Sequence, residues 1–206
     1  EPVRAVAAES GADAVIAAPD GTSFAKAVGL AARRTFEGAH VWLLAQDTAP
    51  EPQALERLAG GLELAPSVWV TGPKLVRWHA PEKIVSLGVT LTTRGRAFEQ
   101  AEGERDQGQH DGMSDVLGVD VRGVLVRAEA WSALAGPDPA LAGADEGLDL
   151  GIRSRLAGGR VSVQPLARVA VAGDGVAGLP DPTHPGGRAR RAYAERTALL
   201  HRRLTF

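Results

Sequence analysis

The residue best placed to do chemistry is Asp47, a single carboxylate that ends an apolar run. Residues 41–44 read Val-Trp-Leu-Leu, and Pro50 and Pro52 break the chain soon after Asp47. A short run with such a polar stop predicts a buried strand. Ligands of open α/β sheets lie outside the carboxyl ends of the strands, so Asp47 is a candidate ligand for a metal ion or a charged group. The competing interpretation, which the spacing alone favours slightly, is that Asp47 only caps the turn before Pro50.

A polar segment at residues 99–114 carries a second set of candidate side chains. They are Glu102, Glu104, Arg105, Asp106, Gln107, Gln109, His110 and Asp111. Loops of this length inside a compact domain usually have a function or are mobile. His110 could bind an acceptor or a metal ion, although an exposed histidine with ordinary hydrogen bonds is the more frequent case.

Two further pairs of residues have a functional and a structural interpretation. Asp149 lies near the predicted start of a helix, where exposed backbone N–H groups favour a carboxylate. Arg153 could pair with a phosphate or with Asp149, and we favour the ion pair. Trp78 and Trp131 could stack on a sugar ring, but an aromatic side chain at the rim of a core is at least as frequent.

Predicted strands and helices alternate over residues 14–62, which is typical of parallel βαβ units. The predicted strands lie at residues 14–18, 41–44, 68–73, 74–78, 84–92, 161–165 and 167–172, with a hairpin-like turn at 94–96. The predicted helices lie at residues 24–32, from Pro52 to Leu62, at 128–134, at 148–157 and at 188–204.

Composition narrows the class of protein. The chain has 206 residues, enough for one domain with a sizeable core. A net charge of -2 gives no support for nucleic-acid binding, and the absence of cysteine excludes disulfides, thiolate zinc sites and cysteine nucleophiles. No apolar run reaches the roughly 20 residues that span a bilayer, no secretory leader opens the chain, and no phosphate-binding glycine loop is present. We therefore expect a cytoplasmic protein, including the cytoplasmic face of the membrane.

Taken in order, several segments resemble the family 2 glycosyltransferases of the GT-A fold, which transfer sugars from nucleotide-sugar donors with inversion. These segments are residues 22–28, 43–52, 71–75, 123–139 and 148–153. Residues 104–111, which include Asp-Gln-Gly-Gln-His-Asp, resemble a segment of the large membrane-associated actinobacterial members. The resemblance implies an α/β fold with a GT-A-like mixed sheet flanked by helices.

The resemblance also implies roles for individual residues. Asp47 would hold Mg²⁺ or Mn²⁺, and the donor's diphosphate would lie against Asp47, Asp149 and Arg153. The residues that it assigns to the glycan acceptor are Gly123, Trp131, Gln109 and His110. Asp145 and Glu146 are the candidates for the catalytic base.

The sequence departs from the family pattern at the positions that carry chemistry. Ala45 stands where the first carboxylate of the metal motif is expected, and Gly147 stands at the catalytic base. The family's downstream histidine would fall near Val171, yet no histidine occurs before His184. A glycine cannot abstract a proton, and loss of a base typically removes a factor of roughly 10² to 10⁴ in rate.

Two functions therefore stay open. The first is an inverting glycosyltransferase domain at residues 1–187 that transfers a sugar from a nucleotide-sugar donor to a cell-envelope glycan acceptor. The second is a degenerate, non-catalytic module with a binding or scaffolding role in a larger membrane protein. The first βαβ unit of a GT-A domain is missing from the pattern, so we expect an N-terminally truncated domain. The basic helix in residues 188–206 packs on the domain by default, or attaches to a membrane beyond the C-terminus.

Overall fold

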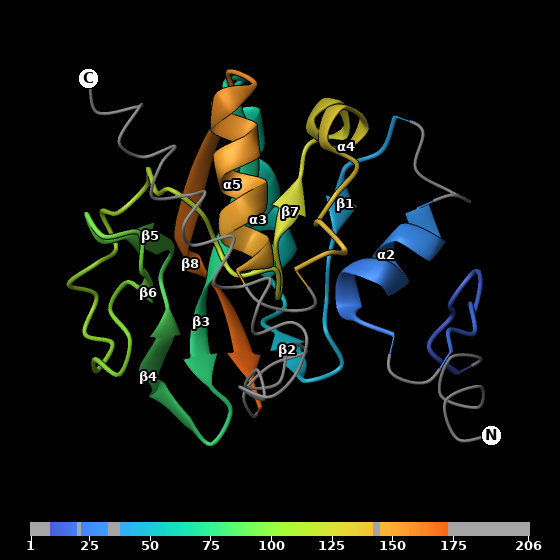
Figure 1. The fold of residues 1–206 in the computed structure, drawn as a ribbon. Helices are drawn as coiled ribbons and strands as arrows, with labels where there is room; N and C mark the ends of the chain where they lie inside the picture. The colour runs from blue at the N-terminus through green and yellow to red at the C-terminus, as the bar shows by residue number, and fades with distance from the viewer. Residues whose placement is uncertain (1–8, 20–21, 33–37, 142–144, 173–206) are drawn as a thin grey trace.

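The computed structural model describes residues 9–19, 22–32, 38–141 and 145–172 (Figure 1). The strands are β1 (Val41–Trp42), β2 (Thr48–Pro50), β3 (Val68–Arg77), β4 (Ala80–Ser86), β5 (Val89–Leu91), β6 (Ala97–Glu99), β7 (Leu125–Val126) and β8 (Arg160–Val171). The helices are α2 (Phe24–Ala32), α3 (Ala54–Glu63), α4 (Ala128–Leu134) and α5 (Glu146–Leu156). The predicted basic helix at 188–204 and the predicted domain boundary at residue 187 lie outside the described residues.

The sheet is mixed, with β3 and β8 at its centre. Its strands follow the order β1-β7-β3-β8-β2, β4 pairs with the other part of β3, and β5 and β6 form a separate hairpin. Among the described strands, β3 and β8 are the only parallel neighbours. The predicted parallel βαβ units over residues 14–62 are therefore wrong. Residues 14–18 belong to no strand, and β1 pairs antiparallel with β7, because a short apolar run becomes a strand only where a neighbour completes its hydrogen bonds.

Pro73 interrupts the sequence pattern but not the strand. The stretches predicted at 68–73 and 74–78 form the continuous β3, and those at 161–165 and 167–172 form β8. Between the Pro73–Gln164 and Lys74–Arg168 pairs, the register of the two strands shifts. A proline donates no backbone hydrogen bond, so an irregularity in the ladder is where a sheet accommodates it.

Other predicted elements are confirmed with shifted ends. Helix α4 has the predicted bounds, α3 begins after Pro52 at Ala54, and α5 begins at Glu146 instead of Leu148. Gly88, with a φ of +97°, divides the strand predicted at 84–92 into β4 and β5. A Cβ at Gly88 would lie 2.7 Å from Val116 Cγ1, so a side chain has no room at this division. The hairpin turn at 94–96 joins β5 to β6 as predicted.

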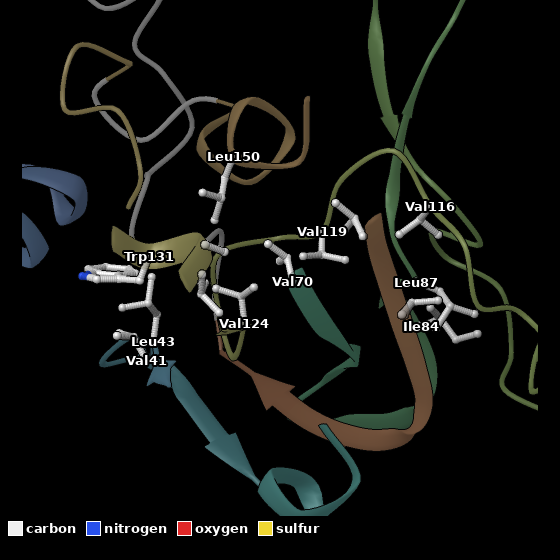
Figure 2. Packing of buried hydrophobic residues seen from close by; sticks show 14 residues of the cluster. Val41, Leu43, Val70, Ile84, Leu87, Val116, Val119, Val124, Trp131 and Leu150 are labelled. Atoms are coloured by element: carbon white, nitrogen blue, oxygen red, sulfur yellow. The ribbon is translucent and has the colours of Figure 1, made fainter. Parts of the chain in front are cut away.

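Helices α3 and α5 cover opposite faces of the sheet (Figure 1). Neighbouring residues of β3 show this arrangement: Thr71 Oγ1 donates to the carbonyl oxygen of Leu58 in α3 (3.2 Å), whereas Val70 packs in the core with Leu150 of α5. Figure 2 shows this core below α5, with Trp131 and the β1 side chains at one end and residues from β4 at the other. The core thus joins the end of β1, the segment before β7 and the start of α5 into one region.

Among the described residues, no helix combines the length and the apolar character that a membrane crossing requires.

Candidate functional site

Backbone pairing places the end of the β1 segment beside the loop that precedes β7. The Leu43 N–H donates to the carbonyl oxygen of Val124 (2.9 Å), and the Gly123 N–H donates to that of Leu43 (2.8 Å). Trp42 Nε1 also donates to the carbonyl oxygen of Gly123 (3.0 Å). These bonds bring Asp47, which follows on the same segment, close to Arg122.

Arg122 lies between two carboxylates. Its Nη1 is 3.6 Å from Oδ2 of Asp47, and its Nη2 is 2.6 Å from Oδ2 of Asp120. Arg122 Nε donates to both carboxylate oxygens of Asp120 at 3.1 Å. Both carboxylate oxygens of Asp47 and Nη1 of Arg122 are buried and form no hydrogen bond. Burial alone would lower the pKa of Arg122, but Asp120 and Asp47 raise it, so the guanidinium stays charged.

Glu99, at the end of β6, extends this group of side chains. The Ser86 hydroxyl donates to Glu99 Oε2. Burial, reinforced by the charge of Asp120, raises the pKa of Glu99 from 4.5 to about 7. Glu99 therefore takes up a proton near neutral pH, unlike an ordinary glutamate. We call Asp47, Ser86, Glu99, Asp120 and Arg122 the Asp47 cluster.

The start of α5 closes the position that the resemblance assigns to the catalytic base. A Cβ at Gly147 would lie 1.7 Å from the carbonyl oxygen of Val119. Cβ atoms at Gly118 and Gly151 would lie 2.7 Å from Leu148 Cα and 2.3 Å from the carbonyl oxygen of Leu117. Segment 117–120 thus packs backbone against backbone on α5, and no side chain fits at residue 147.

The two candidate substitute bases lie at the same helix end. Asp145 precedes α5 with a φ of +55°, and its carbonyl oxygen accepts a hydrogen bond from the Asp149 N–H (2.9 Å). Glu146 is 3% exposed. Their catalytic roles stay predictions.

Asp149 and Arg153 form the ion pair that we favoured. Arg153 Nη2 is 2.6 Å from Asp149 Oδ2, and Nε donates to the same oxygen at 2.7 Å. The guanidinium also donates to the carbonyl oxygens of Leu134 (2.8 Å) and Gly136 (2.9 Å). Arg153 therefore ties α5 to the end of α4, and donor binding by this pair stays a prediction.

Two of the predicted acceptor residues lie in packed positions. Gly123 has a φ of +84°, and a Cβ there would lie 2.9 Å from Pro73 Cγ. Trp131 is 6% exposed and packs in the core with Val41 and Leu43 (Figure 2). The packing gives both residues a structural role, and acceptor binding stays a prediction for them.

The other predicted acceptor residues, Gln109 and His110, bond within their own loop. His110 Nε2 lies 2.8 Å from Glu104 Oε2, and Gln109 Nε2 donates to the carbonyl oxygen of Arg105 at 2.9 Å. The hydrogen bond with His110 lowers the pKa of Glu104. The structure does not bring these residues together with Asp47 through any contact of the Asp47 cluster given above.

Lys74 anchors the same loop to the sheet. Lys74 is 2% exposed, and its Nζ lies 2.8 Å from Asp106 Oδ1 and 2.9 Å from Asp111 Oδ1. Arg168 Nη1 holds the other carboxylate oxygen of Asp106 at 2.7 Å. Burial would raise the pKa of Asp106, but the hydrogen bond and charge of Lys74, with the charge of Arg168, lower it. Two segments that carry the family resemblance, 71–75 and 104–111, therefore meet in one buried ion network.

The residues around Asp47 do not fit a divalent metal ion. Hard cations take several oxygen ligands, and the neighbouring position predicted for a second carboxylate holds the buried Ala45. In the part of the chain that the structure describes, no group of three or more His, Cys, Asp or Glu side chains could hold a metal ion. The positive group against Asp47 is the guanidinium of Arg122.

The sequence analysis missed the partners of Asp47. Asp120 and Arg122 lie in the apolar stretch of residues 116–126, where isolated charges signal either burial with a partner or a site. That signal was available, since Arg122 visibly interrupts the run. Ser86 and Glu99 carried no comparable signal, because only the fold of the hairpin brings Glu99 inward.

Comparisons with known proteins agree with the fold. A family model described as glycosyltransferase like family 2 matches residues 2–194. No curated protein matches the chain. Among solved structures, GalNAc-T7 with UDP, GalNAc and Mn²⁺ is similar with a TM-score of 0.63 and 12% identity. The match covers 82% of this chain but only 34% of GalNAc-T7, and it confirms a GT-A-like mixed α/β fold. Because the family match spans nearly the whole sequence, the chain belongs to the glycosyltransferase-like family 2.

Proposed function

We propose that the chain is a degenerate, non-catalytic member of its family, a GT-A-like module with a binding or scaffolding role in a larger membrane protein. The observation that carries this proposal is the contact at Gly147. Inverting sugar transfer needs a base beside the acceptor hydroxyl. A Cβ at residue 147 would lie 1.7 Å from the carbonyl oxygen of Val119, so the family's base position has no side chain and no space for one.

The ion pairs around the site support the same proposal. Transfer also needs positive charge at the leaving diphosphate. The three arginine and lysine side chains discussed above already have carboxylate partners: Arg122 with Asp120, Arg153 with Asp149, and Lys74 with Asp106. A donor's diphosphate would have to compete with these carboxylates for each cation.

Transfer and hydrolysis assays on the full-length protein test the proposal. A panel of nucleotide sugars is supplied with Mn²⁺ or Mg²⁺, and products are followed by mass spectrometry. We expect no turnover above a sample without protein. Turnover that disappears in a Glu146→Gln variant would refute the proposal.

The second candidate is an active inverting transferase that passes a sugar from a nucleotide-sugar donor to a cell-envelope glycan acceptor at the cytoplasmic face of a membrane. Membership of the family favours it. GalNAc-T7, which shares the fold, was solved with UDP, GalNAc and Mn²⁺. In this case Glu146 or Asp145 serves as the base, and a bound Mg²⁺ or Mn²⁺ would stabilise the leaving diphosphate.

A pair of variants separates the second candidate from background activity. Under this candidate, Glu146→Gln lowers kcat by roughly 10² to 10⁴, the usual effect of removing a base. Glu102→Gln, an exposed glutamate in the long loop, is the matched control and should keep the full rate. An unchanged rate in Glu146→Gln would exclude Glu146 as the base.

A further inference from the structure

We infer that Arg122 keeps divalent metal ions out of the Asp47 cluster, so that its guanidinium is the resident cation of the site. The inference concerns ion binding by the chain itself. It does not depend on whether the domain transfers sugar.

The first argument is where the guanidinium lies. Its Nη1 is 3.6 Å from Asp47, while its Nε and Nη2 both bind Asp120. A metal ion bound by Asp47 on this side would lie against a full positive charge. The two cations would repel each other strongly, because the side chains are buried and water screens them little.

The second argument is that Arg122 cannot leave easily or lose its charge. The residue is 9% exposed, and its backbone N–H donates to Asp120 Oδ1 at 2.8 Å. Asp120 therefore holds both the backbone and the side chain of Arg122. An arginine also stays protonated in proteins, unlike a lysine or a histidine in the same position.

The third argument is the unmet bonding capacity of Asp47. Both of its carboxylate oxygens are buried without a hydrogen bond, and so is Nη1 of Arg122. A buried carboxylate needs a cation nearby, and Arg122 is the one that the structure places there. Removal of the guanidinium would leave Asp47 and Asp120 as two buried carboxylates facing the same vacated space, which is an arrangement that favours a divalent cation.

Titration with Mn²⁺, followed by electron paramagnetic resonance of the free ion, tests the inference without any activity assay. The full-length protein and its Asp47→Asn variant should show the same Mn²⁺ binding. Arg122→Gln should bind Mn²⁺ at least ten times more tightly than the parent protein. The double variant Arg122→Gln with Asp47→Asn should lose this gain.

Arg155→Gln is the matched control, because Arg155 also pairs with an aspartate, Asp115, at 2.7 Å, but on a partly exposed surface. It removes the same charge and should leave Mn²⁺ binding unchanged. Circular dichroism checks that each variant is folded.

Two results would overturn the inference. One is Mn²⁺ binding by the parent protein that falls tenfold or more in Asp47→Asn. The other is a folded Arg122→Gln that gains no Mn²⁺ affinity. If Arg122→Gln does not fold, the comparison of the parent protein with Asp47→Asn still decides. Sugar transfer that proceeds in EDTA would refute the proposed non-catalytic role and leave this inference intact.

Discussion

The carbonyl oxygen of Val119 lies 1.7 Å from the point where a Cβ of residue 147 would stand. This closeness couples two segments that are distant in sequence, the loop before β7 and the start of α5. A carboxylate side chain at residue 147 and the observed docking of Val119 exclude each other. The loss of the family's base is thus built into the packing of the domain, and a single reverse substitution cannot restore it.

Gly147→Ala should destabilise the domain by at least about 3 kcal/mol, because the added methyl group overlaps backbone atoms that cannot turn away. Gly147→Asp should cost more, since it also buries a charge. Urea denaturation followed by circular dichroism measures both. Gly60→Ala in α3 is the control: a Cβ there meets nothing within 4 Å, so we expect stability to stay the same or to rise by up to about 1 kcal/mol. A Gly147→Ala variant as stable as the parent protein would contradict the observed packing.

Glu99 should make the stability of the domain depend on pH. Burial raises its pKa to about 7 in the folded chain, against 4.5 for the model group. The folded state therefore holds the proton more tightly than the unfolded state, and the contribution of Glu99 falls as the pH rises from about 4.5 to about 7. The difference amounts to up to about 3 kcal/mol from the size of the shift.

The test of this dependence is a Glu99→Gln variant, which carries no titrating proton. Relative to the parent protein, it should gain stability at pH 8 and gain little or none at pH 4.5. Thermal unfolding at a series of pH values measures the difference, and Glu63→Gln, an exposed glutamate at the end of α3, is the control. An equal effect of Glu99→Gln at both pH values would rule out a raised pKa.

The order of the central elements could be predicted because each has a strong local signal. Helix α4 and the β5–β6 hairpin follow directly from apolar spacing and from the turn at 94–96. The direction of the strands could not be predicted, because β1 and β7 owe their antiparallel pairing to contacts between segments about 80 residues apart, such as Val41 with Val126. Local propensity contains no information on such pairing.

The same limit applies to the site. Asp47 was recognisable because a lone carboxylate ends an apolar run, but its environment depends on Arg122, which lies far along the chain. The glycine at residue 147 looked like a simple loss of a catalytic group. Its physical reason, the carbonyl oxygen of Val119, becomes visible only when the two segments are brought together.

Lys74→Met should destabilise the domain by about 3–5 kcal/mol. Lys74 is 2% exposed and lies within 2.9 Å of both Asp106 and Asp111, so its removal leaves buried negative charge without its partner. Arg168 still holds one oxygen of Asp106, which places the expected loss at the lower end of this range.

Hydrogen exchange can show where the effect of Lys74→Met lies. Amide protection should fall first in residues 104–111, because Lys74 joins this loop to β3. Lys83→Met, an exposed lysine in β4, is the control and should change stability by no more than about 0.5 kcal/mol. Unchanged protection of the loop in Lys74→Met would show that the ion network does not hold it.

Arg153→Lys should separate the structural role of Arg153 from donor binding. A lysine keeps the positive charge but cannot reach Asp149 and the carbonyl oxygens of Leu134 and Gly136 together, as the guanidinium does. Because the side chain is partly exposed, we expect a loss of about 1–2 kcal/mol in the free energy of unfolding. Arg94→Lys, at an exposed turn position, should change it by no more than about 0.5 kcal/mol. Calorimetry with a panel of nucleotide sugars completes the test: stability that is unchanged, with weaker nucleotide binding in Arg153→Lys alone, would assign Arg153 to the donor instead of to the junction of α4 and α5.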